Sequence, residues 1–306
     1  MTPIHIDLGS RSRPSEKLGD SRELRPRLFF LPQSSAKEAW PVFILTMGAV
    51  LVSLPLLWMF STSLRPSSES YKLPPLWLPT QFHFENYGAL FGSSVPFVTL
   101  FLNSLKITSA VTGGQLVFCS MAGFAFARLR FPARHVLFIL LLASLMVPNQ
   151  VTVIPIFLLM RTFGLIDTHL SIILPGLVSA FGVFMMRQFY LSLPQELIDA
   201  AKLDGAGPWR LYTRIALPLS TPALAALGII SFNTTWNSYF YPLIFLNSWE
   251  KMTLPQGVAL LQGYMQSGNP SVVMAAVTMA ILPVLAIFLI AQRWIVEAFV
   301  SAGIKG

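Results

Sequence analysis

Charged residues are scarce in this sequence. Of its 306 residues, 11% are charged and 54% are hydrophobic, and the mean hydropathy is +0.63. A typical soluble domain carries about 25% charged residues. The composition therefore excludes an ordinary soluble globular protein. It predicts a polytopic membrane protein, with enough length for several spans of roughly 20 residues each.

Cysteine is nearly absent as well. Cys119 is the single cysteine and lies inside an apolar run, so an intrachain disulfide is excluded. A cleavable signal peptide is not expected, because the first apolar run is too long, begins too far from the N-terminus and lacks a clear small-residue cleavage site.

Motifs for catalysis are also missing. The sequence has no phosphate-binding GxxxxGK(S/T) motif, and the terminal GIKG is not one. Its four histidines are scattered and lack the spacing of metal ligands: His5, His83, His135 and His169. We therefore expect a chain that is not an enzyme and that holds no metal and no cofactor of its own.

Aspartate and glutamate are absent from the predicted membrane interior, where Lys106 is essentially the one ionisable residue. Proton or ion coupling usually needs ionisable residues within the spans. Lys106 either extends toward the outer headgroups, which we favour, or lines a pathway. An ion-coupled secondary transporter is therefore the weaker alternative. A receptor or an assembly protein would not require the hairpin described below.

The apolar residues that are present form six runs, at about 40–64, 97–126, 135–160, 168–190, 220–246 and 274–298. They predict an all-α membrane protein of about six transmembrane helices at residues 38–306, preceded by a basic, flexible tail at 1–37. Several runs contain proline or a glycine pair, which indicate either kinked helices around a cavity or ordinary bundle packing: Pro55, Pro148, Pro155, Pro175, Pro242, Pro283 and Gly113–Gly114.

Lysine and arginine are distributed unevenly between the loops. One side of the predicted membrane holds the basic tail, the loops near 128–134 and 187–214, and the C-terminal end; the other holds Arg65, Lys72, Arg161 and Lys251. The positive-inside rule places both termini in the cytoplasm. Topology and anionic membrane lipid then account for the net charge of +8, and no nucleic-acid partner is expected.

The longest interior segment unsuited to a bilayer is residues 193–218, LPQELIDAAKLDGAGPWRLYTRIALP. Ser192 and Gln195 have capping-box spacing, and Pro194 suits a first helical turn. The first helix is predicted to end at about Leu203, with Gly205 in the left-handed conformation. Pro208 is predicted to start a second helix, which Pro218 stops.

Small residues and two aspartates dominate the turn of this hairpin: Asp199, Ala200, Ala201, Asp204, Gly205, Ala206 and Gly207. A surface with so few side chains suits close approach by a soluble partner. The alternative is an amphipathic connector that lies on the lipid headgroups.

The segment IDAAKLDGA, followed by IALP, resembles the EAA loop of ABC importer permeases, with Asp199 in place of the usual glutamate. Four other segments are similar to carbohydrate permeases: NSL at 103–105, AFARLRFPAR at 125–134, WNSY at 236–239 and the terminal QRWIVEAFVSAGIKG. FENYGALF at 84–91 also resembles this family, although its aromatics equally fit an interfacial belt. From about residue 40 onward, the chain resembles MalG-like inner-membrane permease subunits of maltose-type carbohydrate ABC importers, in the binding-protein-dependent transport family.

The resemblance implies a type I importer permease in a bacterial inner membrane. It implies as partners a second, MalF-like permease subunit, two copies of an ATPase subunit that bind ATP and Mg, and an extracytoplasmic solute-binding protein. Asp199 to Ala201 and Asp204 to Ala206 would form the coupling helix that docks on the ATPase. The tail at 299–306, with Gly303, Lys305 and Gly306, would also contact it.

Two further sets of residues are candidates for solute handling. The resemblance implies that the loop residues Gln262, Gly263 and Tyr264 contact the binding protein; the alternative is a plain connector. In the fifth run, Asn233 and Asn237 share a helical face that Tyr241 is predicted to continue, with Trp236 and Tyr239 beside it. These residues either line the translocation path or make interhelical hydrogen bonds. The predicted function is ATP-driven import of a sugar or oligosaccharide, with glycerol phosphate or another polar solute as the alternative.

Overall fold

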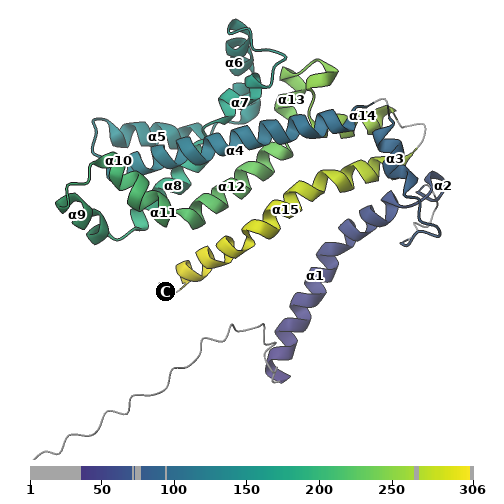
Figure 1. Cartoon of the computed structure of the whole chain (residues 1–306), viewed down its shortest axis with the longest axis horizontal. Coiled ribbons are helices and arrows are strands. Elements are labelled where there is room, and N and C mark those ends of the chain that lie inside the picture. The colour runs from purple at the N-terminus through teal and green to yellow at the C-terminus, as the bar shows by residue number, and fades with distance from the viewer. Residues whose placement is uncertain (1–35, 71, 73–76, 94, 265–268, 304–306) are drawn as a thin grey trace, which may run out of the picture. The chain divides into compact units, whose positions relative to one another are not determined.

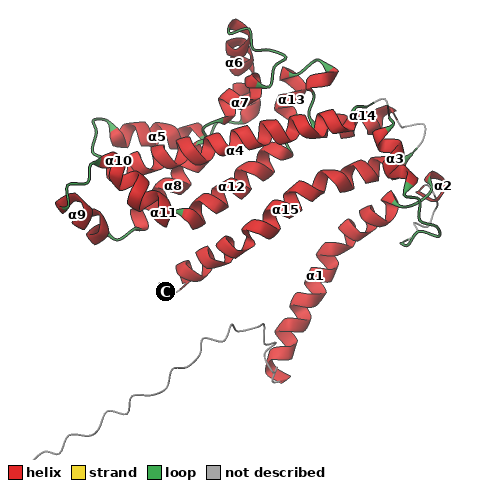
Figure 2. Cartoon of the chain, in the orientation of Figure 1, coloured by secondary structure: helices red, strands yellow, loops and turns green. Residues whose placement is uncertain are grey.

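The computed structural model describes residues 36–70, 72, 77–93, 95–264 and 269–303. Over these residues the chain forms helices and turns, with no strand, as Figures 1 and 2 show. The predicted all-α class is confirmed.

The longer helices are α1 (Ala36–Ser63), α4 (Phe97–Arg128), α5 (Arg134–Ser144), α6 (Asn149–Thr162), α8 (Ala180–Ser192), α9 (Gln195–Leu203), α12 (Thr221–Trp236), α14 (Leu254–Tyr264) and α15 (Pro270–Gly303). Shorter helices lie between them: α2 (Ser67–Ser70), α3 (Glu85–Phe91), α7 (Leu170–Gly176), α10 (Pro208–Leu211), α11 (Leu217–Leu219) and α13 (Phe240–Phe245). A π-helix, η1 (Tyr212–Ala216), and a 3-10 helix, η2 (Trp249–Lys251), complete the described elements.

The chain divides into two compact units, and the boundary falls after Val52, within α1. The described part of the first unit is the start of α1, an apolar helix in which the rings of Trp40 and Phe43 stack at 6.0 Å. The second unit holds the remaining elements and the candidate site.

Four helical segments of the described chain are long and apolar enough to cross a membrane: Trp40–Ser63, Phe97–Arg128, Leu170–Ser192 and Pro270–Ile290. Two bent pairs qualify together: Arg134–Ser144 with Asn149–Thr162, at 106°, and Pro208–Leu219 with Thr221–Trp236, at 76°. The predicted number of about six spans is reached when each bent pair counts as one span. The fifth predicted run, 220–246, is not one continuous helix, because α12 ends at Trp236 and α13 begins at Phe240.

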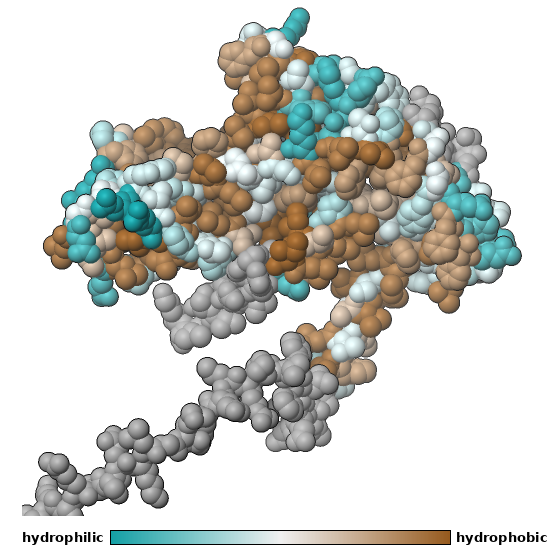
Figure 3. All heavy atoms as spheres, viewed as in Figure 1, coloured by the Kyte–Doolittle hydropathy of each residue, from teal (hydrophilic) through white to brown (hydrophobic). Residues whose placement is uncertain are grey.

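Helix α4 is the central element of the second unit, and it packs against α8 and α12, while α12 packs against α15. Small residues permit this close packing. A Cβ atom on Gly123 of α4 would lie 2.7 Å from the Met186 Cβ and 2.8 Å from the Arg187 backbone nitrogen on α8. Hydrophobic side chains cover much of the visible helix surface, and hydrophilic ones gather around α9–α10 and around the segment after α13 (Figure 3).

The segment between α13 and α15 is more ordered than a plain connector. Its helix α14 packs against α4 and α15, and Leu254 and Leu261 are buried. The Leu254 backbone N–H donates to Ser104 Oγ at 2.7 Å, which fixes α14 on α4. In the first long loop, the buried side chain of Asn86 donates to the backbone oxygens of Ser63 and Arg65. This amide therefore joins α3 to the end of α1.

Candidate functional site

The hairpin at 193–218 begins differently from the sequence prediction. Ser192 ends α8 and its hydroxyl donates to Phe189 O at 2.8 Å, while Pro194 occupies the N-cap position of α9. Gln195 donates instead to Asp199 Oδ1 at 2.9 Å. The predicted capping box is therefore wrong, because Ser192 is still within the preceding helix.

The predicted end of α9 agrees with the structure. Helix α9 closes at Leu203, and Gly205 has φ +76°, the left-handed region that glycine tolerates best. Ala206 N donates to Ala201 O at 2.9 Å and Gly205 N to Lys202 O at 3.0 Å. These two bonds form a Schellman motif, which caps the last carbonyls of α9 and fixes the turn.

The six predicted coupling residues lie on two faces of the hairpin. Ala201 and Ala206 are half-buried and pack toward the core formed by α4, α8 and η1. The side chain of Ile198, which the sequence did not single out, is buried as well, with 2% of its surface exposed. Asp199, Ala200, Asp204 and Gly205 are exposed. The second set is therefore accessible from outside the chain, while the first set packs the hairpin against the rest of the second unit.

Asp199 is held within its own helix. The Gln195 amide and then the Lys202 ammonium, at 3.3 Å, hold the pKa of its carboxyl below the ordinary aspartate value. The carboxylate is fully charged at neutral pH and remains accessible to a partner.

Sequence reasoning missed three apolar side chains on the hairpin. Leu203 is 90% exposed, Trp209 65% and Leu197 47%. Leu197 and Leu203 lie on α9, outside the candidate spans, where such exposure is expected of a docking surface. The signal was present in the sequence as Leu203 and Trp209 on either side of the Asp-Gly-Ala-Gly turn.

Sequence reasoning also missed the clamp made by Arg128. The sequence indicated only that this residue belongs to a basic loop on the positive side of the membrane. In the structure its guanidinium donates to the backbone oxygens of Tyr190 and Leu193 at 2.6 Å each and to Gln195 Oε1 at 2.6 Å. Arg128 ends α4, so it ties that helix to the end of α8 and the start of α9. The guanidinium is permanently charged.

The second arm of the hairpin is longer than predicted. Pro208 starts α10 as expected, but Pro218 does not stop the helix, because it sits within the short α11. Between them, η1 widens the turn over five residues. Tyr212 in η1 is buried and its hydroxyl lies 2.7 Å from Ser120 Oγ on α4. The break that ends this arm lies at Ser220.

The five predicted path residues do not form one surface. Asn237 donates to Asn233 O and Oδ1, as the i, i+4 spacing predicts. Trp236 is 3% exposed and its indole donates to Ala280 O on α15 at 2.9 Å, which is an interhelical bond. Tyr241 does not continue the α12 face, because the helix stops first. Tyr239 lies with Trp236 and Asn237 in a separate cavity beside α14.

A cavity of about 840 Å³ lies among several of the helices. Tyr241 is the one predicted path residue that lines it. The other walls come from α4, from the α5–α6 and α7–α8 segments and from the end of α12. Its polar groups were not predicted, because they lie in four segments that are distant in the sequence.

The other residues predicted to contact partner proteins lie at the edges of the segments that the structure describes, or outside them. Gln262 and Gly263 are exposed near the end of α14. Tyr264 ends that helix, and its side chain lies outside the described residues. Gly303 ends α15, whereas Lys305 and Gly306 lie outside the described residues.

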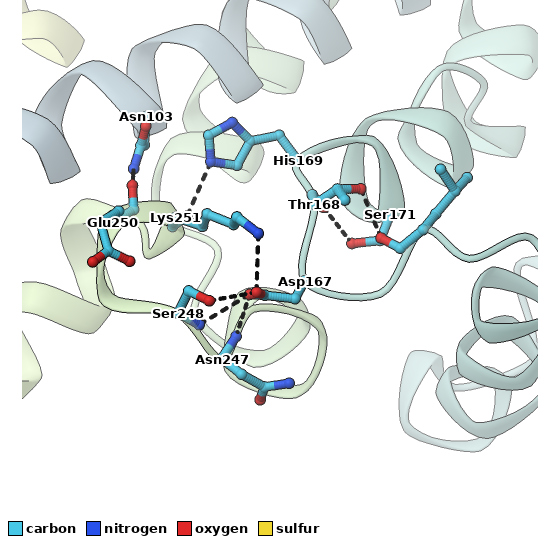
Figure 4. Close-up of polar contacts among 10 residues, drawn as sticks. Asn103, Asp167, Thr168, His169, Ser171, Asn247, Ser248, Glu250 and Lys251 are labelled. Atoms are coloured by element: carbon cyan, nitrogen blue, oxygen red, sulfur yellow. Dashed lines mark hydrogen bonds and ion pairs between the residues drawn. The ribbon is translucent and has the colours of Figure 1, made fainter.

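A polar cluster joins three segments near α7 and α13 (Figure 4), on the far side from the hairpin helices α9 and α10 (Figure 1). The Asp167 carboxylate accepts from the backbone of Asn247 and Ser248 at 2.9 Å each, from the Ser248 hydroxyl, and from Lys251 Nζ at 3.0 Å. These bonds, that of the Ser248 hydroxyl first, hold the Asp167 pKa far below its ordinary value. The cluster therefore fixes the α6–α7 turn against the α13–α14 segment.

Two further side chains extend this cluster. The His169 imidazole hydrogen-bonds to Lys251 O at 3.0 Å, and Asn103 on α4 donates to Glu250 O at 2.8 Å and Met252 O at 3.0 Å. Lys106 is exposed beside His169 and Lys251. In the described part of the chain, no group of three or more His, Cys, Asp or Glu side chains is placed to hold a metal ion.

Comparison with known proteins gives matches over most of the chain. The family model described as "Binding-protein-dependent transport system inner membrane component" matches residues 119–300. The arabinooligosaccharides transport system permease protein AraQ of Bacillus subtilis is 36% identical over 279 residues, which cover 90% of this chain and 98% of the relative. The sn-glycerol-3-phosphate transport system permease protein UgpE of Brucella abortus is 33% identical, with 84% and 94% covered.

A solved structure has the same fold. It is a chain of a bacterial ABC transporter involved in the import of the acidic polysaccharide alginate, with a TM-score of 0.72, 24% identity, and coverage of 86% of this chain and 99% of that one. A structure of the bacterial alginate ABC transporter in complex with its pentasaccharide-bound periplasmic protein matches with a TM-score of 0.57 and 17% identity.

Proposed function

The chain belongs to the family of binding-protein-dependent transport system inner membrane components, and we propose that it is the permease subunit of an ATP-driven importer of a sugar or oligosaccharide. The observation that carries this proposal is the hairpin: a capped, clamped helical element with three exposed apolar side chains. Such a surface is built for a soluble partner.

We assign that partner as an ATPase subunit, present in two copies, which binds ATP and Mg. A second permease subunit completes the membrane part, and an extracytoplasmic binding protein delivers the solute, with Gln262, Gly263 and Tyr264 in its contact region. The positive-inside distribution supports a cytoplasmic position for the hairpin and both termini, with Gly303, Lys305 and Gly306 near the ATPase.

The hairpin geometry suits a rigid lever. Arg128 joins the start of α9 to the ends of α4 and α8, and Ala201 of the same helix packs against the core formed by α4, α8 and η1. When the ATPase subunits close on ATP, motion of α9 would pass to these helices and tilt them, which alternates access to the membrane interior. Asp199 and Asp204 would fix α9 by charged hydrogen bonds, and Ala200 and Gly205 would allow close approach.

We propose a sugar or oligosaccharide as the solute because AraQ, which is 36% identical, is named as a permease protein of an arabinooligosaccharide transport system. Glycerol phosphate is the alternative, because UgpE is nearly as similar.

Substitution of Leu203 tests the docking proposal. Full burial of a leucine side chain stabilises a contact by about 2 kcal/mol, so Leu203→Ser should weaken ATPase binding roughly thirtyfold. The measurement is the amount of ATPase subunit that copurifies with the tagged chain from native membranes in mild detergent.

Leu78→Ser is the matched control, because Leu78 is 77% exposed in the first long loop, on the far side from the hairpin. The control should retain the ATPase. Equal retention by both variants, or absence of any ATPase from the wild-type sample, would refute the proposal.

A further inference from the structure

Three helix breaks meet at the cavity of about 840 Å³. Its lining includes Leu145 and Pro148 between α5 and α6, Val178 and Ser179 between α7 and α8, and Ser238 between α12 and α13. Backbone that leaves a helix within a membrane is tolerated where it is buried in protein or lines a water-filled cavity. A water-filled cavity would satisfy the backbone groups that these breaks leave free.

The side chains that line the cavity are polar but uncharged. They include the amides of Gln115, Asn149 and Gln150 and the hydroxyls of Thr234, Ser238 and Tyr241, and no Asp, Glu, Lys, Arg or His is among the lining residues described. Gln115 is held in place by its bond to Gly176 O at 2.9 Å. Amides and hydroxyls both donate and accept hydrogen bonds, as sugar hydroxyls do.

The helix ends at the cavity add partial charges of both signs. Residues at the N-termini of α6 and α8 line it, and so do residues at or near the C-termini of α5, α7 and α12. Helix N-termini favour anions and C-termini favour cations. At the α8 N-terminus, Ser179 Oγ already accepts from Gly182 N at 2.9 Å. The ends together supply donors and acceptors without a net charge.

We infer that this cavity is a direct contact site for the transported solute and that it selects a neutral, polyhydroxylated solute over an anionic one. The inference rests on the proposed importer function and narrows its solute class. A phosphate or carboxylate in this cavity would lose its hydration without a cationic partner from this chain, which is costly. Phosphorylated and uronate solutes are therefore disfavoured.

The test uses the whole transporter, copurified with its partner subunits and placed in lipid nanodiscs without a binding protein. Equilibrium binding is measured for two neutral probes, arabinotriose and maltotriose, and for the anionic trigalacturonate. The wild type should bind at least one neutral trisaccharide about tenfold more tightly than trigalacturonate.

Two variants locate the binding to this cavity. Gln115→Leu removes one amide, and loss of its hydrogen bonds should weaken the neutral probe about fivefold. Gln292→Leu is the matched control, because Gln292 is exposed on α15 away from the cavity lining; it should bind as the wild type does. Gln150→Lys places a cation in the cavity and should increase trigalacturonate binding.

Tighter wild-type binding of trigalacturonate, or no binding of either neutral probe, would overturn the inference. Equal effects of Gln115→Leu and Gln292→Leu on binding of the neutral probe would also overturn it. ATP hydrolysis by the same nanodiscs tests the importer function separately. If the ATPase subunit is present and active while the anionic probe is preferred, the solute assignment fails and the proposed function stands.

Discussion

Ala133 and Asp167 are the described residues other than glycine with a positive φ, and both have φ 59°. Each residue begins a turn between helices, and an L side chain in this region costs roughly 1–2 kcal/mol. Aspartate tolerates the conformation better than alanine, because its carboxylate can bond locally. In this chain the Asp167 carboxylate bonds to a distant segment instead, the backbone of Asn247 and Ser248.

The conformation of Ala133 predicts that glycine is better at this position. Ala133→Gly removes the Cβ clash while Ala133 O still accepts from Leu137 N to start α5. The gain should be about 1 kcal/mol, or close to 2 °C in the thermal midpoint of the detergent-solubilised protein. Ala143→Gly, inside α5, should instead lower stability by about 1 kcal/mol. A lower midpoint for the first variant would contradict the argument.

Asp167→Asn should destabilise the cluster on the far side from the hairpin by about 2 kcal/mol, because it removes charge-assisted bonds. The pKa of Asp167 is depressed in the folded protein. Its contribution is thus complete above the unfolded value of about 3.9 and is lost as pH falls through the folded value.

The difference in thermal midpoint between Asp167→Asn and the wild type should therefore stay constant from pH 8 to pH 5. Glu250→Gln is the control, because Glu250 contributes its backbone oxygen to the cluster (Figure 4). A difference that disappears at pH 8 would show that the Asp167 charge is not the stabilising feature.

At the scale of elements, the hairpin depends on Arg128. Arg128→Gln removes the bonds to Tyr190 O and Leu193 O, so α9 should lose its rigid attachment to α4 and α8. We expect solute uptake to fall at least tenfold while ATP hydrolysis by the assembled transporter continues.

Arg130→Gln is the control for this prediction, because Arg130 is exposed two residues further along. Uptake by this variant should stay near the wild-type level. Parallel loss of uptake and hydrolysis in Arg128→Gln would show that Arg128 supports assembly and not coupling.

The ends of the hairpin helices were predictable where a single residue determines them. Gly205 fixes the end of α9 and Pro208 the start of α10, because each acts through its own backbone. The capping box at Ser192 failed because α8 extends over that residue, and the stop at Pro218 failed because the preceding π-helix already redirects the backbone hydrogen bonds.

The cavity was less predictable, because its shape arises from contacts between distant segments. Hydropathy alone does not separate a continuous apolar helix from one broken at Asn237–Tyr239. Tyr241 was therefore placed on the wrong helix face, and the amides Gln115 and Asn149 were missed. Arg128 was visible in the sequence, but its carbonyl partners appear only after α4 and α8 pack together.

At the scale of the molecule, orientation is the main prediction. Cys119 is the single cysteine, so Cys119→Ser yields a cysteine-free protein into which single cysteines can be introduced for labelling. A cysteine at Glu196, exposed on α9, should react with a membrane-impermeant maleimide only after the cells are opened. A cysteine that replaces Glu250 should react with the same maleimide when the outer barrier of the cell is permeabilised and the membrane that holds the protein is intact. The reverse pattern would invert the assigned topology.

The π-helix η1 has a consequence for insertions and deletions in this chain. An α-helix turns about 100° per residue, so the loss of one residue from α9 or α12 would rotate everything beyond it onto a different face. A π-helical turn already contains one extra residue, and such turns occur often at functional sites. Removal of the exposed Arg214 would let the turn tighten to an α-helix while the flanking helices keep their faces. This five-residue stretch is thus where the chain can lose one residue while α9 and α12 keep their packed faces.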